Sequence, residues 1–377
     1  MPFRTPLVVP GLLAPLLLVA CTAGEDTCED DAARGAGPTV RPVSSVSSVA
    51  PAVAVDPDAT VWADAAALSP DGDRLLVACD GGPCLWDTDT GRRLDASDLG
   101  GVAGDPVWAG DTLVSSSGPT YDARGRVVFG DTEGGGSCTV LAHEVDFATD
   151  GRGGSVRFAV AADEETMVST AQDDRIGRWS VADRARTDWL DVGVEDPGAL
   201  ALAPDGTLLA VGTPDGVVVH DLDADARVAS LDGPLAELAW SPDGTALAGL
   251  DDRGTPTVVD TTTWRPTATL PPSARFEAGR LAWSPDSAHL ALVGATVAGD
   301  AAGDGAGDGR VLSWTPGTGA HVELTEHAEV PSSVIWGPDG TGVYSVDSVA
   351  GARRTPVVDG RPTGVPRRYP TPAPITG

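Results

Sequence analysis

Short apolar runs alternate with turns rich in Pro, Asp and Gly along most of the chain. Residues 199–231 hold four such runs in succession, at 199–203, 207–212, 217–221 and 227–231. The middle runs are almost continuously apolar and the last is more polar, as in sheets that are stacked face to face. The pattern predicts units of four antiparallel strands and hence an all-β fold.

The turn between the first and second run of each unit carries a recurring phrase. Pro sets φ for the first central turn position, Asp can accept a bond from the backbone two residues on, and Gly accepts a positive φ. The phrase recurs every 38 to 53 residues, close to the roughly 40–50 residues of a four-stranded propeller blade. Its copies are Leu68-Ser-Pro-Asp-Gly72, Trp108-Ala-Gly-Asp111, Val160-Ala-Ala-Asp-Glu164, Leu202-Ala-Pro-Asp-Gly206, Trp240-Ser-Pro-Asp-Gly244, Trp283-Ser-Pro-Asp-Ser287 and Trp336-Gly-Pro-Asp-Gly340.

The phrase, followed by a strand, an Asp-bearing turn and Trp-Asp, resembles WD-repeat and TolB-type β-propellers over roughly residues 60–360. Most units lack the His that opens a WD repeat, so we expect its Asp–His–Ser–Trp hydrogen-bond network to be incomplete. The resemblance implies a seven-bladed β-propeller of four-stranded antiparallel blades and says little about function. The matching positions are Trp86-Asp87, Trp179-Ser180, His220-Asp221, Thr325-Glu-His327 and, more weakly, Leu141-Ala-His143.

Domain boundaries follow from these units. We expect the propeller at residues 52–360, after a solvated linker at 21–51 and before a Pro-rich tail at 361–377. The tail is a poor donor for a strand ladder because its prolines lack an N–H group. Residues 39–49 alternate well enough to be a strand, and we predict that they close the seventh blade.

Residues 1–20 combine one early Arg, an apolar run interrupted by Pro, and small residues. The run is shorter than the roughly 20 residues of a membrane-spanning helix and predicts a secretion signal. Leu18-Val-Ala-Cys21 resembles the lipobox of bacterial lipoproteins, which implies a lipid on Cys21 and a position on the extracytoplasmic face of the cell membrane. The alternatives are an ordinary signal peptide with an unrelated Cys and a short buried helix.

Besides Cys21 the chain has four cysteines, Cys28, Cys79, Cys84 and Cys138. An even number is what we expect if they pair as disulfides in an oxidising compartment. Cys79 and Cys84 flank a short turn between two strand-like runs, where opposed residues lie about 4.5 Å apart and can be bridged. We expect this disulfide, and by elimination one between Cys28 and Cys138. A zinc site is disfavoured because the C-x4-C spacing is wrong and no His is near.

The formal charge of -30, from 55 acidic and 25 basic residues, disfavours nucleic-acid binding. Acidic residues recur in the turn between the second and third run of most units, and a propeller gathers these turns on one face. Asp is a common turn residue; alternatively these residues form an acidic rim that steers a cationic partner. The rim would comprise Asp80, Asp173, Asp174, Asp215, Asp251, Asp252 and Asp347.

Candidate catalytic chemistry is sparse. The five His residues, at 143, 220, 289, 321 and 327, fall in unrelated positions, so no metal pair or triad follows from spacing. Neither Lys nor Asn occurs, which excludes a Schiff-base lysine and a P-loop. The Gly- and Asp-rich stretch at 298–309 lacks the spacing of known calcium loops and is interpreted as a hairpin insertion. We therefore expect no cofactor and no metal.

The tryptophans divide into two sets. Trp108, Trp240, Trp283 and Trp336 share one register at the end of the first strand, which indicates packing between blades. Trp189 and Trp264 fall outside that register and are the candidates for exposed aromatic side chains.

These observations favour a monomeric, lipid-anchored, non-catalytic scaffold that binds a protein partner. Two alternatives stay open: a propeller enzyme, such as a metal-dependent hydrolase or lactonase, and a lipoprotein that binds a solute or glycan.

Overall fold

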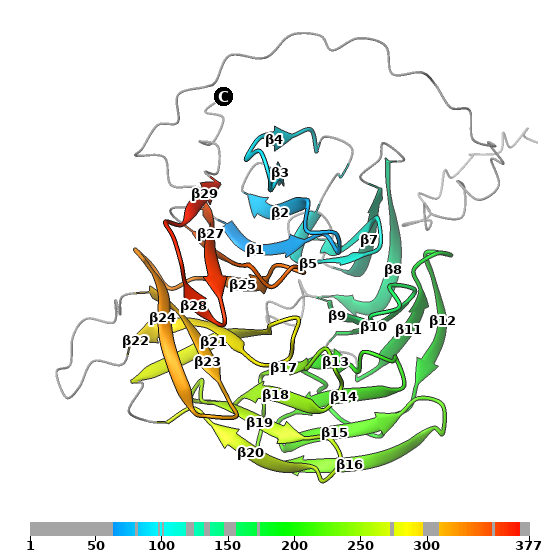
Figure 1. Ribbon diagram of the computed structural model, residues 1–377. Coiled ribbons are helices and arrows are strands. Elements are labelled where there is room, and N and C mark those ends of the chain that lie inside the picture. Colours follow the sequence, from blue (N-terminus) through cyan, green and yellow to red (C-terminus); the bar gives the residue numbers. More distant parts are fainter. Residues whose placement is uncertain are drawn as a thin grey trace, which may run out of the picture.

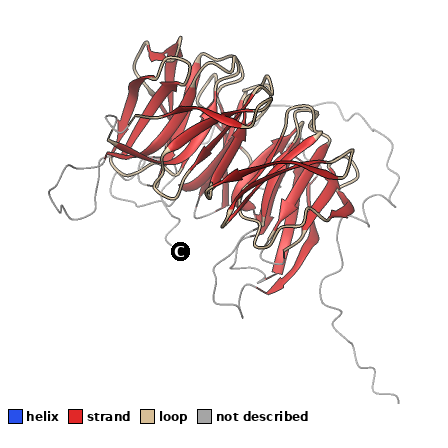
Figure 2. Cartoon of the chain, turned by 90° about the horizontal axis from the view of Figure 1, so that it is seen from below, coloured by secondary structure: helices blue, strands red, loops and turns tan. Residues whose placement is uncertain are grey.

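The computed structural model describes residues 63–79, 82–96, 99, 102–117, 124–131, 136–146, 156–171, 174–271, 275–296, 309–348 and 351–369. Figure 2 shows this part of the chain as β-strands joined by loops at two faces. The same ranges contain no helix that is long and apolar enough to cross a membrane.

The strands form seven antiparallel sheets, numbered here as blades one to seven in chain order. Blades one to four contain β1 (Ala63–Leu68), β2 (Arg74–Cys79), β3 (Gly82–Asp87) and β4 (Arg93–Leu94); β5 (Val102–Ala109), β6 (Thr112–Ser117), β7 (Arg124–Asp131) and β8 (Gly136–Asp146); β9 (Arg157–Val160), β10 (Thr166–Thr170), β11 (Ile176–Ser180) and β12 (Ala185–Leu190); β13 (Leu200–Leu202), β14 (Leu208–Thr213), β15 (Gly216–Asp221) and β16 (Ala226–Asp232). Blades five to seven contain β17 (Glu237–Trp240), β18 (Ala246–Leu250), β19 (Pro256–Asp260) and β20 (Arg265–Thr269); β21 (Phe276–Trp283), β22 (Leu290–Thr296), β23 (Gly309–Thr315) and β24 (Ala320–His327); β25 (Ser333–Trp336), β26 (Gly342–Asp347), β27 (Gly351–Val358), β28 (Arg361–Pro362) and β29 (Arg367–Tyr369).

The first strands of the blades form a closed ring. Each contacts the first strand of the next blade, and β25 contacts β1. Figure 1 shows these strands around a centre, with outer strands such as β12, β16 and β20 at the periphery. The predicted seven-bladed β-propeller of four-stranded antiparallel blades is confirmed.

In each blade the strands follow one another in chain order and alternate in direction, so the ring has two different faces. On the entry face lie the starts of the first strands, the turns between second and third strands, and the connections between blades. On the phrase face lie the turns between first and second strands and those between third and fourth strands. All seven copies of the recurring phrase therefore share the phrase face.

The core lies between the blades. Seven clusters of buried apolar residues each combine side chains of two neighbouring blades, one cluster for every blade-to-blade contact. In the repeated Trp register, Nε1 of Trp240 donates to the carbonyl of Ala201 at 3.1 Å, and Nε1 of Trp283 donates to that of Ala239 at 3.0 Å. The interpretation of this register as packing between blades is confirmed.

The phrase forms the turn that its residues predict. In blade five, Oδ1 of Asp243 accepts bonds from the Ser241 hydroxyl at 2.7 Å and from the Thr245 N–H at 3.0 Å. Gly244 has a φ of 73°, a value that only glycine adopts without strain. The hydroxyl bond from Ser241 and the backbone bond from Thr245 hold the pKa of Asp243 below its ordinary value of 3.8.

The seventh blade closes differently from our prediction. Both β28 and β29 pair with β27, whose outer edge we had expected residues 39–49 to occupy. The C-terminal segment can pair because Arg367–Tyr369 lies between two prolines, and its three residues supply their own N–H groups. The expectation that this segment is excluded from the ladder is wrong, and residues 39–49 lie outside the described ranges.

The closing segment also joins blade seven to blade one. The side chain of Tyr369 is fully buried, and its hydroxyl donates to the carbonyl of Thr88 at 3.0 Å. The guanidinium of Arg367 donates to the same carbonyl at 2.8 Å and to that of Asp89 at 2.6 Å. The last described strand is therefore bonded to the first blade.

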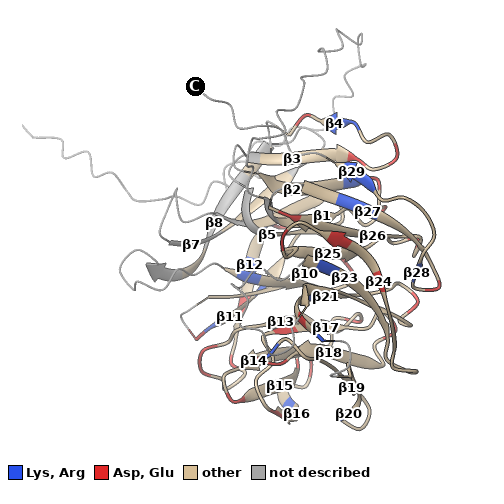
Figure 3. Ribbon diagram, turned by 90° about the vertical axis from the view of Figure 1, so that its left-hand side faces the viewer, with Lys and Arg blue, Asp and Glu red and all other residues tan. Residues whose placement is uncertain are grey.

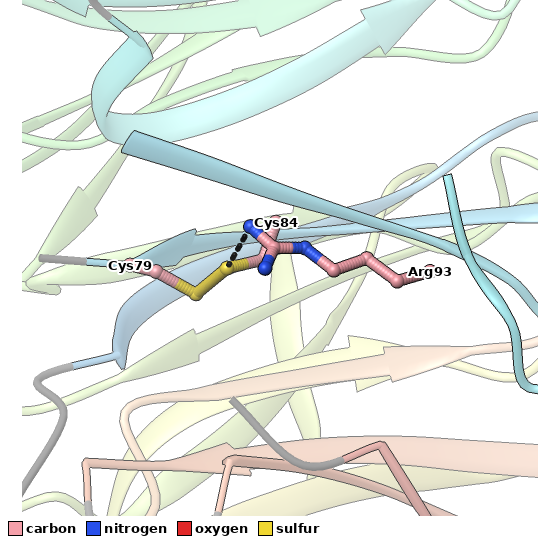
Figure 4. Close-up of a disulfide and its surroundings, with 3 residues drawn as sticks. All are labelled: Cys79, Cys84 and Arg93. Atoms are coloured by element: carbon pink, nitrogen blue, oxygen red, sulfur yellow. Dashed lines mark hydrogen bonds between the residues drawn. A yellow bond between two sulfur atoms is a disulfide. The ribbon is translucent and has the colours of Figure 1, made fainter. Parts of the chain in front are cut away.

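The disulfide between Cys79 and Cys84 is present, with the two Cα atoms 6.0 Å apart (Figure 4). It joins the end of β2 to β3, and Cys84 pairs in register with Val77, so the bridge is diagonal and not between directly opposed residues. Cys28 lies outside the described residues, and its pairing with Cys138 on β8 stays a prediction.

Candidate functional site

The turns proposed as an acidic rim lie on the entry face. The side chains of Asp174, Asp215 and Asp252 are exposed there. Asp251 is half-buried, and its Oδ1 accepts bonds from the N–H groups of Arg253 at 2.9 Å and Thr255 at 2.7 Å, so it shapes its own turn. Asp80 and Asp173 lie outside the described residues. Figure 3 shows acidic positions in many loops, and both acidic and basic positions on strands.

Asp347 does not belong to this surface, in contrast to our expectation. Its side chain is 0% exposed, and Oδ2 lies 2.6 Å from Nδ1 of His327. The other ring nitrogen, Nε2, lies 2.8 Å from the Ser345 hydroxyl. His327 is the last residue of β24, the fourth strand of blade six, and its ring lies against Asp347 at the end of β26. This contact connects blade six to blade seven. The exposed rim is thus smaller than the sequence indicated.

A buried cation accompanies this pair. Nη2 of Arg353 lies 3.9 Å from Oδ2 of Asp347, and Nη1 donates to the carbonyl of Glu326 at 2.6 Å. Burial lowers the pKa of the Arg353 guanidinium, and the neighbouring Arg368 lowers it further. Asp347 supplies the compensating negative charge, so the three side chains form one buried electrostatic unit.

A related network joins blades two and three. Nε2 of His143 lies 2.9 Å from the Ser169 hydroxyl, which also accepts a bond from Nε1 of Trp179 at 2.8 Å. The network of blade three thus holds His, Ser and Trp, and that of blade seven holds Asp, His and Ser. By register, Thr355 stands in blade seven where blade three has Trp179. Both His residues are bonded structural groups.

The largest groove described on the entry face lies between blades three and four. It has a volume of about 640 Å³, and its acidic lining residues come from the connection before β13, the turn after β14 and the end of β16. The guanidinium of Arg227, which also lines it, donates to the carbonyl of Gly193 at 3.2 Å. The acidic lining residues are Glu195, Asp196, Asp215 and Asp232.

This groove extends the exposed part of the rim. Oδ1 of Asp174 accepts a bond from the N–H of Asp196 at 2.6 Å, which connects the turn of blade three to the wall of the groove. The sequence analysis identified Asp174 and Asp215 but not Asp196. Asp196 lies in the connection between blades three and four, and these connections have no sequence pattern that recurs from blade to blade. Four carboxylates beside one arginine make the groove suitable for a cationic side chain.

The central channel contains a second cavity, of about 240 Å³, lined by the first strands of blades three to seven. Its polar lining residues include Arg157, Glu237 and Arg280, none of which the sequence reasoning singled out. Nη1 of Arg280 donates to Oε2 of Glu237 at 2.9 Å. A signal in the sequence could have identified them, because each of the three lies three residues before the start of a copy of the recurring phrase.

The two candidate exposed tryptophans are both partly covered. Trp264 packs edge-on against Trp240, with ring centroids 6.0 Å apart. Trp189 lies under the guanidinium of Arg186, 4.0 Å from the ring centroid, and Arg175 is 5.3 Å from the same centroid. Stacked arginines occupy the faces that a sugar ring would need, so this arrangement gives no support to a glycan platform.

Within the described ranges, no three His, Cys, Asp or Glu side chains are grouped so that they could hold a metal ion. The Asp-rich stretch at 298–309 falls almost entirely outside those ranges. The features that the described residues provide are the entry-face groove and the cavity of the channel.

Comparison with known proteins supports the fold. No family model matches the chain. No curated protein matches it either. Among solved structures, a chain of the "Crystal Structure of Mitotic Checkpoint Complex" is similar with a TM-score of 0.59 and 17% identity, over 82% of this chain and 94% of that one. Because 1719 chains of solved structures are similar, the likeness establishes a common WD40-like propeller fold and no particular function.

Proposed function

We propose that this chain is a non-catalytic, monomeric scaffold that presents the entry face of a WD40-like propeller to a cationic protein partner. We also propose that a lipid on Cys21 tethers the chain to the extracytoplasmic side of a bacterial membrane. The assignment to the TolB type within propellers belongs to the same proposal and rests on the Pro-Asp phrase and the scarcity of opening His residues.

The groove between blades three and four carries the partner proposal. Two of its four carboxylates lie on the connection between blades three and four and two lie on blade four, and a buried core joins these blades, so the ring holds the spacing of the carboxylates. A basic segment that docks there meets negative potential at preformed positions and loses little conformational freedom of the scaffold. A chain with a formal charge of -30 adds long-range attraction for such a partner.

The anchoring proposal rests on the sequence of residues 1–21. Its test is membrane fractionation of cells that express the full chain with Cys21 or with Cys21→Ser. The wild-type chain is expected in the membrane fraction with the mass increase of a lipid, and the variant is expected to lose both. Equal fractionation of the two chains would contradict the anchor and leave the partner proposal untouched.

The partner proposal is tested by crosslinking and affinity purification from those cells, comparing Asp215→Arg/Asp232→Arg with the wild type. The matched control is Asp89→Arg/Asp223→Arg, which reverses the same number of exposed carboxylates on the phrase face. A partner that docks in the groove is expected to be lost from the first variant, retained by the second, and weakened by added salt. Equal recovery with both variants would refute this surface.

A further inference from the structure

One position of the repeat lines the central channel near the entry face. It is the third residue before the start of each recurring phrase, and its copies in blades three to seven lie together in the channel. The last five copies line the cavity of about 240 Å³. In blades one to seven the position is occupied by Ala65, Asp105, Arg157, Ala199, Glu237, Arg280 and Ser333.

The described ionisable groups that line this cavity carry more positive than negative charge. Glu237 and Arg280 form an ion pair at 2.9 Å, with 23% and 35% of their side chains exposed. The side chain of Arg157 is exposed and makes no hydrogen bond or ion pair with the described part of the chain. Among the described residues that line the cavity, the guanidinium of Arg157 is therefore the cation left to pair with a ligand.

The rest of the lining is apolar except for one hydroxyl. Ser333, from β25, is half-buried. At roughly 30 Å³ per water, the cavity has room for about eight waters or an organic group of similar size. Such a group would have the guanidinium of Arg157 and apolar residues among the groups that line its site. The apolar lining residues are Phe158, Ala199, Leu200, Leu238, Leu281 and Val334.

We propose that this cavity binds the carboxylate of a small monoanionic ligand that carries a short apolar chain. The planar fork of Arg157 pairs with both carboxylate oxygens, which a guanidinium does better than any other side chain. The Ser333 hydroxyl donates a further bond, and the hydrocarbon displaces water from Phe158 and Leu200. Glu237 holds Arg280 and repels a second negative charge, so a monoanion is preferred to a dianion.

Two sources supply this chemistry: a free short-chain acid, and the C-terminal residue of a peptide that ends in an apolar amino acid. The site uses residues of the channel and none of the groove carboxylates. The proposal of a ligand in the channel is therefore independent of the proposal that a cationic partner docks in the groove.

The test is calorimetric titration of the purified full chain with 4-methylpentanoate and with its neutral isostere 4-methylpentanamide. The acid is expected to bind at least about tenfold more tightly, because the amide loses a charge-assisted bond. Arg157→Gln is expected to remove that preference, and Arg157→Lys to retain part of it. Arg265→Gln, which changes an exposed arginine on the outer strand β20, is the matched control and is expected to bind as the wild type does.

Three results would overturn the proposal: no saturable binding of the acid, equal affinity for acid and amide, or unchanged binding by Arg157→Gln. Thermal unfolding of each variant checks that it is folded, and if Arg157→Gln does not fold, Arg157→Lys and Ser333→Ala make the same comparison. The peptide Ala-Ala-Leu, with a free or an amidated C-terminus, separates the sources. Tighter binding of the free peptide than of 4-methylpentanoate assigns a peptide terminus, and the reverse order assigns a free acid.

Discussion

Oδ2 of Asp347 lies 2.6 Å from Nδ1 of His327, and both side chains are fully buried between blades six and seven. The same carboxylate faces the buried guanidinium of Arg353 at 3.9 Å. An acidic turn residue that resembles the exposed rim in sequence is thus a part of the packing between blades.

Replacing this carboxylate is expected to destabilise the ring. Asp347→Asn keeps the size of the side chain but leaves Arg353 buried without its counter-charge, which costs about 3–5 kcal/mol when one member of a buried pair is removed. The measurement is urea unfolding of the variant and the wild type. Asp252→Asn, on the exposed surface, is the control and is expected to stay within about 0.5 kcal/mol of the wild type. A loss below about 1 kcal/mol for Asp347→Asn would show that Asp347 does not compensate Arg353.

The closing strand gives a second prediction. Tyr369→Phe keeps the ring but removes the hydroxyl and with it the bond to the Thr88 carbonyl, and is expected to cost about 1 kcal/mol. Tyr369→Ala also leaves a cavity between blades one and seven and is expected to cost about 3–5 kcal/mol. Chemical unfolding followed by Trp fluorescence measures both. Two variants as stable as the wild type would indicate that the ring does not depend on β29 for closure.

The phrase glycines offer a matched pair. Gly72 and Gly340 both have positive φ, at 81° and 69°. A Cβ at Gly72 would lie 2.9 Å from Cγ of Pro338, whereas a Cβ at Gly340 meets nothing within 4 Å. Gly340→Ala is expected to cost the left-handed strain alone, about 1–2 kcal/mol, and Gly72→Ala more than that. Equal losses in thermal unfolding would show that the neighbouring blade yields to the added methyl group.

Stability is expected to fall in acid. The Ser69, Ser241 and Ser284 hydroxyl bonds depress the pKa values of Asp71, Asp243 and Asp286 below 3.8 in the folded chain. Their contribution is complete above pH 3.8 and disappears as the pH falls through the lower folded-state pKa values. Thermal unfolding as a function of pH measures this.

The control for the acid experiment is Asp243→Asn, which removes one of these groups. Its melting temperature is expected to depend less steeply on pH below 3.8 than that of the wild type. Parallel curves for the two proteins would mean that Asp243 does not contribute to the acid transition.

The architecture was predictable because its signals are local. Ser241, Asp243 and Gly244 specify their turn through bonds within five residues, and the shared Trp register follows from strand length. The position of Asp347 was not predictable in this way. In sequence it resembles Asp215, but in the folded chain it is buried against His327 of the preceding blade and Arg353.

The closing strand and the channel residues show the same limit. Proline content argued against the C-terminal segment, yet the three residues Arg367–Tyr369 between prolines suffice for pairing. Arg157 and Glu237 belong to blades three and five; both lie three residues before a copy of the recurring phrase, but that spacing does not by itself show that they line one cavity. Such relationships arise from closure of the ring.

The pairing of β29 with β27 has a consequence for the order of events during synthesis. β29 is the last of the described strands in chain order, so the seam between the last blade and the first stays open until all seven blades have been synthesised. Until then the nascent protein is an incomplete arc with an unpaired edge at β27, and Arg367–Tyr369 turn that arc into a circle.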